Sequence, residues 1–247
     1  MAEKQRPRRA STVILLRRGE REGFEIFLTR RPEGMAFLGG MYCFPGGTVR
    51  EEDSSPELLR RCYGLTPAAA RKVLGSRFAP GEALSFWIAA IRELFEETGV
   101  LLAADAATLG QRLHPSQPDL ASTIGRYERK KDDANVASFQ TVLETRNLVC
   151  DLSRLHYLSH WQTPSEQPIR FDTRFFLTLL PEHQSPLSSS PEVTHSVWVT
   201  PDEALKRFEN NELPMIFPTF ASIRRLGDFD SLEALLSERG MPDSSSR

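Results

Sequence analysis

The chain has 247 residues, 40% of them hydrophobic and 26% charged, and its formal net charge is −2. This size is enough to bury a sizeable core, so one large domain is expected. The nearly balanced charge gives no overall basic field, which argues against nucleic acid as a partner. No apolar run approaches the roughly 18 residues of a membrane-spanning helix, so no membrane association is expected.

The cysteines indicate the compartment. Cys43, Cys62 and Cys150 are odd in number and widely spaced. They form neither a disulfide framework nor a zinc-binding pattern, which fits a reducing environment. We therefore expect a cytoplasmic protein.

The first predicted elements are two strands and a glycine turn. Thr12 to Leu16 is an apolar run typical of a buried strand, and Phe24 to Thr29 is its expected partner. Phe44-Pro45-Gly46-Gly47 follows. Without side chains, the backbone of two adjacent glycines can approach a ligand closely, and one of their carbonyl groups can reach a metal ion.

Residues 54 to 80 are predicted to be mainly helical. Pro56 to Tyr63 and Pro67 to Leu74 each begin with a proline, which favours the first turn of a helix. Gly64-Leu65-Thr66 separates them. The segment is either a small helical cap beside a site or a neutral surface elaboration.

A longer helix is predicted to begin near Gly81 and to end at Gly99, where glycine can adopt the left-handed conformation that ends a helix. Its apolar residues recur three and four positions apart, which makes one buried stripe. The residues of the stripe are Leu84, Trp87, Ile88, Ile91, Leu94 and Phe95.

The end of this helix carries three acidic residues on a second face. Glu93, Glu96 and Glu97 span only about 6 Å along the helix axis, so their carboxylates repel one another. The helix dipole also disfavours negative charge at this end. The positive charge of Arg92 offsets only part of this unfavourable electrostatic energy. Such a group is either solvated or neutralised by cations, and carboxylate oxygens suit hard divalent ions such as Mg²⁺ and Mn²⁺.

The second half of the chain is predicted to contain three strands and several helices. Residues 104 to 150 are expected to be mostly helical and polar. The expected strands are Val100 to Ala103, Phe171 to Leu180 and Glu192 to Trp198. Three helices are also expected: one begins at Pro201, the second ends near Leu226, and the third covers Ser231 to Arg239.

Arg92-Glu93-Leu94-Phe95-Glu96-Glu97-Thr98-Gly99-Val100 resembles the second half of the Nudix box, G-x5-E-x7-R-E-U-x-E-E-x-G-U, where U is apolar. The turn that ends in Gly47 resembles its first half, and Asp53 stands where the family has its first glutamate. In the family seven residues separate that glutamate from the arginine, whereas here 38 residues, 54 to 91, intervene.

The resemblance implies an α/β fold: a Nudix-type α/β/α sandwich around a mixed β-sheet, with a helical insertion. It implies a Nudix domain over residues 10–226, the insertion at 54–80 within the box, and a C-terminal helix and tail at 227–247. The interrupted box is similar to that of peroxisomal coenzyme A diphosphatases of the Nudix family.

A second resemblance concerns the substrate. The segment from Phe27 to Gly47 resembles the motif of coenzyme A-cleaving Nudix hydrolases, L-L-T-x-R-[SA]-x3-R-x3-G-x3-F-P-G-G, with Thr29 and Arg31 at matching positions. Pro32 and Ala36 depart from it. The resemblance implies that Thr29, Arg31 and Gly47 bind substrate.

The family likeness also implies a metal site. Arg92 would orient the acidic group by ion pairing, and one carboxylate would take a proton from water. The implied ligands of Mg²⁺ or Mn²⁺ are the Gly46 carbonyl, Glu93, Glu96, Glu97 and, before the late strand, Glu192.

The expected function is metal-dependent cleavage of a pyrophosphate bond in a small nucleotide, with coenzyme A or acyl-coenzyme A as the leading substrate. ADP-ribose, dinucleoside polyphosphates and capped RNA are alternatives. A non-catalytic nucleotide-binding module of the same fold is the alternative of a different class. The sequence leaves the oligomeric state open.

Overall fold

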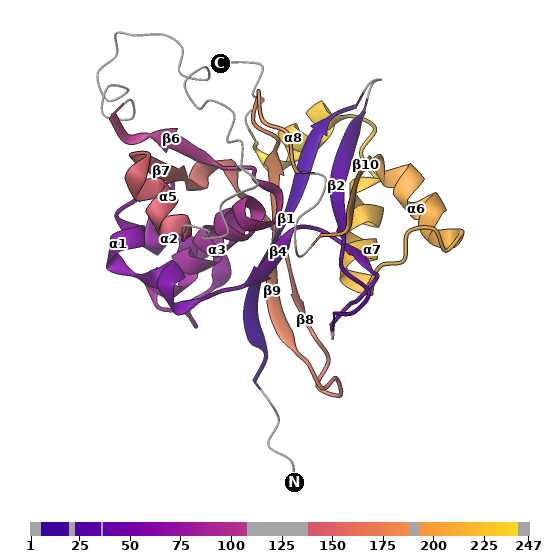
Figure 1. The fold of residues 1–247 in the computed structure, drawn as a ribbon, viewed down its shortest axis with the longest axis horizontal. Coiled ribbons are helices and arrows are strands. Elements are labelled where there is room, and N and C mark those ends of the chain that lie inside the picture. The colour runs from indigo at the N-terminus through magenta and orange to yellow at the C-terminus, as the bar shows by residue number, and fades with distance from the viewer. Residues whose placement is uncertain (1–5, 20–22, 36, 108–137, 188–192, 242–247) are drawn as a thin grey trace.

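A computed structural model of the protein describes residues 6–19, 23–35, 37–107, 138–187 and 193–241. It confirms the expected α/β class and the sandwich. Figure 1 shows a central sheet with helices on both faces. No helix within these ranges is long and apolar enough to span a membrane.

The central sheet is mixed, because β1 and β9 are parallel whereas the other neighbouring strands are antiparallel. Successive residues of β1 face opposite sides. Val13 and Leu15 enter the core under α3, and Ile14 and Leu16 enter the core on the other face. In spatial order the strands are β10 (His195–Val199), β2 (Phe24–Arg30), β1 (Arg8–Arg18), β9 (Phe171–Leu179) and β8 (His156–Gln162), with β3 (Tyr42–Cys43) on β2 and β4 (Gly46–Thr48) on β1.

Helix α3 (Pro80–Thr98) covers one face of the sheet, and its ends match the prediction. Every residue of the predicted apolar stripe is buried. Gly99 adopts a left-handed conformation with φ 75°, and its N–H bonds to the Phe95 carbonyl. The buried Ser11 hydroxyl of β1 donates to the Phe86 carbonyl of α3 at 2.7 Å, which fixes the strand against the helix.

Three C-terminal helices cover the opposite face, in agreement with the sequence. Ile223, Leu226 and Leu235 are among the residues they bury in the second core. The division of the chain at residue 227 stays a prediction. The helices are α6 (Pro201–Glu209), α7 (Phe217–Leu226) and α8 (Leu232–Arg239).

The insertion contains a strand that the sequence prediction missed. The first predicted helix ends early, because Cys62 and Tyr63 pair in parallel with Cys150 and Asp151 instead of continuing the helix. A second sheet with the order β5-β7-β6 results. The elements are η1 (Glu51–Ser54), α1 (Pro56–Leu59), β5 (Cys62–Tyr63), α2 (Pro67–Leu74), β6 (Ala103–Asp105) and β7 (Leu148–Asp151).

The segment after α3 also differs from the prediction. The strand expected over 100–103 begins only at Ala103, because the Leu101 backbone N–H and carbonyl bond to the Gln184 side chain at 2.8 and 3.0 Å instead of to a neighbouring strand. Residues 108–137 lie outside the described ranges. Beyond them, α5 (Phe139–Thr145) is helical as expected, whereas β7 lies where helix was predicted, and the short η2 (Leu152–Arg154) follows it.

Candidate active site

The acidic face of α3 is directed into the protein. Only 6% of Glu93 and 7% of Glu97 is exposed, and Glu96 is partly exposed. A solvated acidic face, one of the two possibilities left open by the sequence, therefore does not describe these residues. Buried carboxylates need hydrogen bonds or cations, and the surroundings supply both.

Asp53 and Arg92 form the centre of this network. The fully buried Asp53 carboxylate accepts from Arg92 Nε at 2.8 Å and from Nη2 at 3.0 Å. Arg92 Nη2 also donates to the Thr48 carbonyl at 2.8 Å, and the backbone N–H of Arg50 donates to Asp53 at 2.8 Å. Burial alone would lower the pKa of Arg92, but Asp53 and Glu93 outweigh it and raise that pKa.

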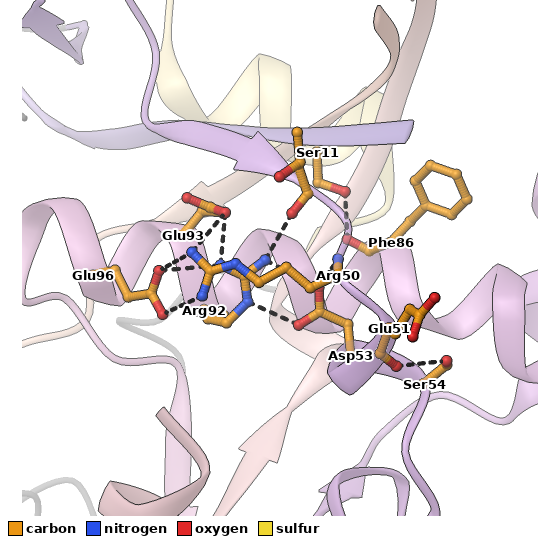
Figure 2. Close-up of polar contacts among 10 residues, drawn as sticks. Ser11, Arg50, Glu51, Asp53, Ser54, Phe86, Arg92, Glu93 and Glu96 are labelled. Atoms are coloured by element: carbon orange, nitrogen blue, oxygen red, sulfur yellow. Dashed lines mark hydrogen bonds and ion pairs between the residues drawn. The ribbon is translucent and has the colours of Figure 1, made fainter. Parts of the chain in front are cut away.

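Two arginines reach the glutamates (Figure 2). Arg92 Nη1 lies 2.6 Å from Glu93 Oε1 and 3.1 Å from Glu96 Oε2. Arg50, whose side chain is 49% exposed, donates to both oxygens of Glu96 at 3.2 and 2.9 Å. Burial raises the pKa of Glu93 above its usual value, although Arg92 opposes that shift.

The glycine turn meets the same face of α3. The backbone N–H of Gly46 donates to Glu97 Oε2 at 3.2 Å. A Cβ placed on Gly47 would lie 2.6 to 2.7 Å from the carboxylate atoms of Glu93, which is closer than real Cβ contacts allow. A side chain at this position would therefore displace the Glu93 carboxylate. The fold thus joins the two separated halves of the box.

Thr29, Arg31 and Cys43 lie beside the acidic group. Burial and the charge of Glu97 raise the pKa of the Cys43 thiol to about 11, and Arg31 opposes this shift. Thr29 is buried and donates from Oγ1 to the Cys43 carbonyl at 3.3 Å. Arg31 Nε is buried and has no hydrogen-bond partner among the described residues. The substrate-binding roles of Thr29 and Arg31 stay predictions.

Glu192 and Ala36 lie outside the described ranges, so the structure does not place them. Within those ranges, no group of three or more acidic, histidine or cysteine side chains is already arranged around a metal position. The donor chemistry nevertheless fits a hard divalent cation, because carboxylates converge beside a glycine turn. In this structure the positive charge beside Glu96 comes from the Arg50 guanidinium.

The sequence analysis missed Arg50 and left the role of Asp53 open. No local pattern predicts the contact of Arg50, because Glu96 lies 46 positions further along the chain. Counted from Gly47, Asp53 occupies the position of the family's first glutamate, as the sequence indicated, and the structure places its carboxylate on Arg92.

The fold identifies the class of protein. It is similar to that of a NUDIX hydrolase from Alicyclobacillus acidocaldarius, known from a crystal structure, with a TM-score of 0.73 and 28% sequence identity. The similarity covers 95% of this chain and 97% of that one. The protein therefore has the Nudix fold.

The family follows from the sequence match. A model of the NUDT19 Nudix domain matches residues 7–226, so the chain belongs to the NUDT19 Nudix domain family. It is 32% identical over 248 residues to the acyl-coenzyme A diphosphatase NUDT19 of Gallus gallus, covering 86% of this chain and 63% of the relative. The Homo sapiens protein of that name is 31% identical over 244 residues, covering 87% and 63%. The chain thus spans about 63% of the length of these relatives.

Proposed function

We propose that the protein is a metal-dependent Nudix hydrolase that cleaves the pyrophosphate bond of coenzyme A or acyl-coenzyme A. The observation that carries this proposal is the approach of Glu93 and Glu97 to the Gly46-Gly47 turn, with Glu96 joined to Glu93 through Arg92, since this places oxygen donors beside a backbone without side chains. The names of the avian and human relatives support the choice of substrate class.

The acidic residues and the Gly46 carbonyl would hold Mg²⁺ or Mn²⁺. A bound divalent cation neutralises phosphate oxygens and lowers the pKa of a coordinated water. Arg92 does not touch the substrate in this proposal. It positions Glu93 and Glu96, and Asp53 holds Arg92 in place.

The reaction is hydrolysis of an anhydride. A water oxygen forms a bond to one phosphorus atom, the bridging P–O bond breaks, and the water proton passes to a carboxylate of the acidic group. The products are two phosphate monoesters. From coenzyme A these are 4′-phosphopantetheine and 3′,5′-ADP.

Arg31 is the proposed anion contact of the substrate. It lies beside the Cys43 thiol, which also feels the charge of Glu97, and its buried Nε lacks a partner in the part of the chain that the structure describes. A guanidinium group with an unused donor suits a phosphate oxygen. Arg31→Ala should therefore raise KM for coenzyme A about tenfold or more, with a smaller change in kcat.

A second candidate is a nucleotide-binding module without catalysis. The observation that favours it is that Arg50 and Arg92 already neutralise Glu96, as they would in a site that takes no metal. ADP-ribose, dinucleoside polyphosphates and capped RNA remain the alternative substrates if the protein is an enzyme.

One experiment separates these candidates. The purified protein is incubated with Mg²⁺ or Mn²⁺ and each of a panel of diphosphate-linked nucleotides, and products are identified by mass. The appearance of 4′-phosphopantetheine and 3′,5′-ADP supports the proposal. Turnover of ADP-ribose with coenzyme A intact overturns the substrate, and binding of the panel without any turnover favours the module.

A further inference from the structure

We propose that Arg50 is a displaceable counter-ion of the acidic group, which competes with the divalent cation for Glu96 and leaves it when the cation binds. This inference rests on the proposed metal-dependent function and deepens it. It assigns to one arginine of this chain a role in setting the affinity of the site for metal.

The contact between Arg50 and Glu96 has the geometry of a strong ion pair. Arg50 Nη1 and Nη2 lie 3.2 and 2.9 Å from the two carboxylate oxygens of Glu96, and Nη2 lies 3.8 Å from Glu93 Oε1. Two parallel N–H···O contacts are the usual arrangement of arginine on a carboxylate. The guanidinium therefore occupies the carboxylate oxygens through which Glu96 would coordinate a metal ion.

Arg50 is free to leave, whereas Arg92 is not. The Arg92 side chain is 5% exposed and is held by Asp53 and the Thr48 carbonyl. The Arg50 side chain is 49% exposed, so water can replace its partner at little cost. Its backbone N–H stays bonded to Asp53, so the side chain can swing out without disturbing the turn.

Before a metal ion binds, the ion pair between Arg50 and Glu96 also reduces the repulsion within the acidic group. Three carboxylates in the last turns of one helix repel one another and oppose the helix dipole. The positive charge of Arg50 on Glu96 reduces that repulsion and keeps the group assembled. The consequence is a lower apparent metal affinity, because the binding-competent fraction excludes molecules in which Arg50 covers Glu96.

Isothermal titration with Mn²⁺ tests the inference in the full chain without measuring activity. Arg50→Gln removes the charge but keeps the backbone contact to Asp53. It should lower the Kd for Mn²⁺ about fivefold, the change expected from removing a partly exposed ion pair. Arg9→Gln is the matched control. It breaks an exposed pair with Glu82 (3.0 Å) at the other end of α3 and should leave the Kd unchanged.

The outcomes separate the two proposals. Wild-type protein that binds Mn²⁺, with equal or weaker binding by Arg50→Gln, overturns the role of Arg50 and leaves the hydrolase proposal standing. Wild-type protein that binds no Mn²⁺ overturns the metal-dependent function, and the role of Arg50 falls with it.

A second measurement uses the wild-type protein, in which the charge of Arg50 is retained. Arginine side-chain NMR of the wild type follows the Nε–Hε signal of Arg50, assigned by its loss in Arg50→Lys, during titration with diamagnetic Mg²⁺. The signal should move toward the position of a solvated guanidinium, while that of Arg9 stays in place. A static Arg50 signal at Mg²⁺ saturation contradicts displacement even if Arg50→Gln proves unstable.

Discussion

Asp53 and Arg92 are 39 positions apart in the sequence, yet their side chains form a two-point ion pair at 2.8 and 3.0 Å inside the protein. The intervening insertion leaves this contact intact. Arg92 in turn bonds to Glu93 and Glu96, so the position of the acidic group depends on a residue outside α3.

Removal of the Asp53 charge should therefore affect both stability and catalysis. Asp53→Asn leaves the buried Arg92 short of a charged partner, which should lower the free energy of unfolding by about 3 kcal/mol. It should also lower kcat, because Glu93 and Glu96 lose their fixed position. Chemical denaturation and steady-state kinetics measure the two effects. Glu51→Gln, an exposed acid in the same η1 turn, is the control. Equal stability of the two variants would contradict the role of Asp53.

The close approach of Gly47 to Glu93 gives a second prediction. Gly47→Ala places a Cβ where the Glu93 carboxylate now lies, and a shift of a catalytic group by about 1 Å can cost about 10²-fold in rate. We expect that loss in kcat/KM and weaker Mn²⁺ binding by titration. Gly81→Ala is the control, since its Cβ meets Leu59 at an ordinary 3.8 Å. Wild-type activity in Gly47→Ala would exclude the arrangement described.

Glu97→Gln tests the proposed chemistry directly. The amide keeps the size of the side chain and can still accept the Gly46 N–H, but it is a poor metal ligand. The variant should fold normally by circular dichroism and lose about 10²-fold or more in kcat, about 3 kcal/mol in the barrier. Glu203→Gln, an exposed residue in the first turn of α6, should match the wild type. Hydrolysis by Glu97→Gln at the wild-type rate would refute the assignment.

Cys43 gives a prediction about pH. Its pKa is raised from 9.0 to about 11, so only about 10⁻³ of it is thiolate at pH 8 and alkylation by iodoacetamide should be slow. Between pH 9 and 11 the folded state holds a proton that the unfolded state loses, so this thiol lowers stability as pH rises. Denaturation at pH 8 and pH 11 should show a smaller loss in Cys43→Ala than in the wild type. An equal loss would contradict the shift.

Local features of the sequence were enough to predict α3. The glycine after its end and the apolar stripe of constant spacing are both short-range signals, and the helix runs from Pro80 to Thr98, close to the expected start near Gly81 and end at Gly99. The apolar runs of β1 and β9 were recognisable for the same reason. The sandwich followed from the resemblance to the family.

Contacts between distant segments were not predictable in the same way. Whether the helix after Pro56 continues or gives way to β5 depends on β7, which lies far along the chain and offers Cys62 a pairing partner. The substrate-binding role of Thr29 stays a prediction from its motif position, and no local pattern predicts the contact of its hydroxyl with the Cys43 carbonyl, which results from the pairing of β2 with β3. Side chains alternate between the two faces along a strand, but the strand that pairs with β2 is set by a segment further along the chain and is not specified by local sequence.

The strand β5 has a consequence for protein engineering. It belongs to the insertion, yet it covers one edge of β7, whose other edge is covered by β6. Trimming residues 54 to 80 to restore an ordinary box would leave β7 with unpaired amides and carbonyls, and exposed edges of this kind promote association between molecules. A shortened variant should therefore elute from a sizing column as aggregates unless that edge is given a new neighbour.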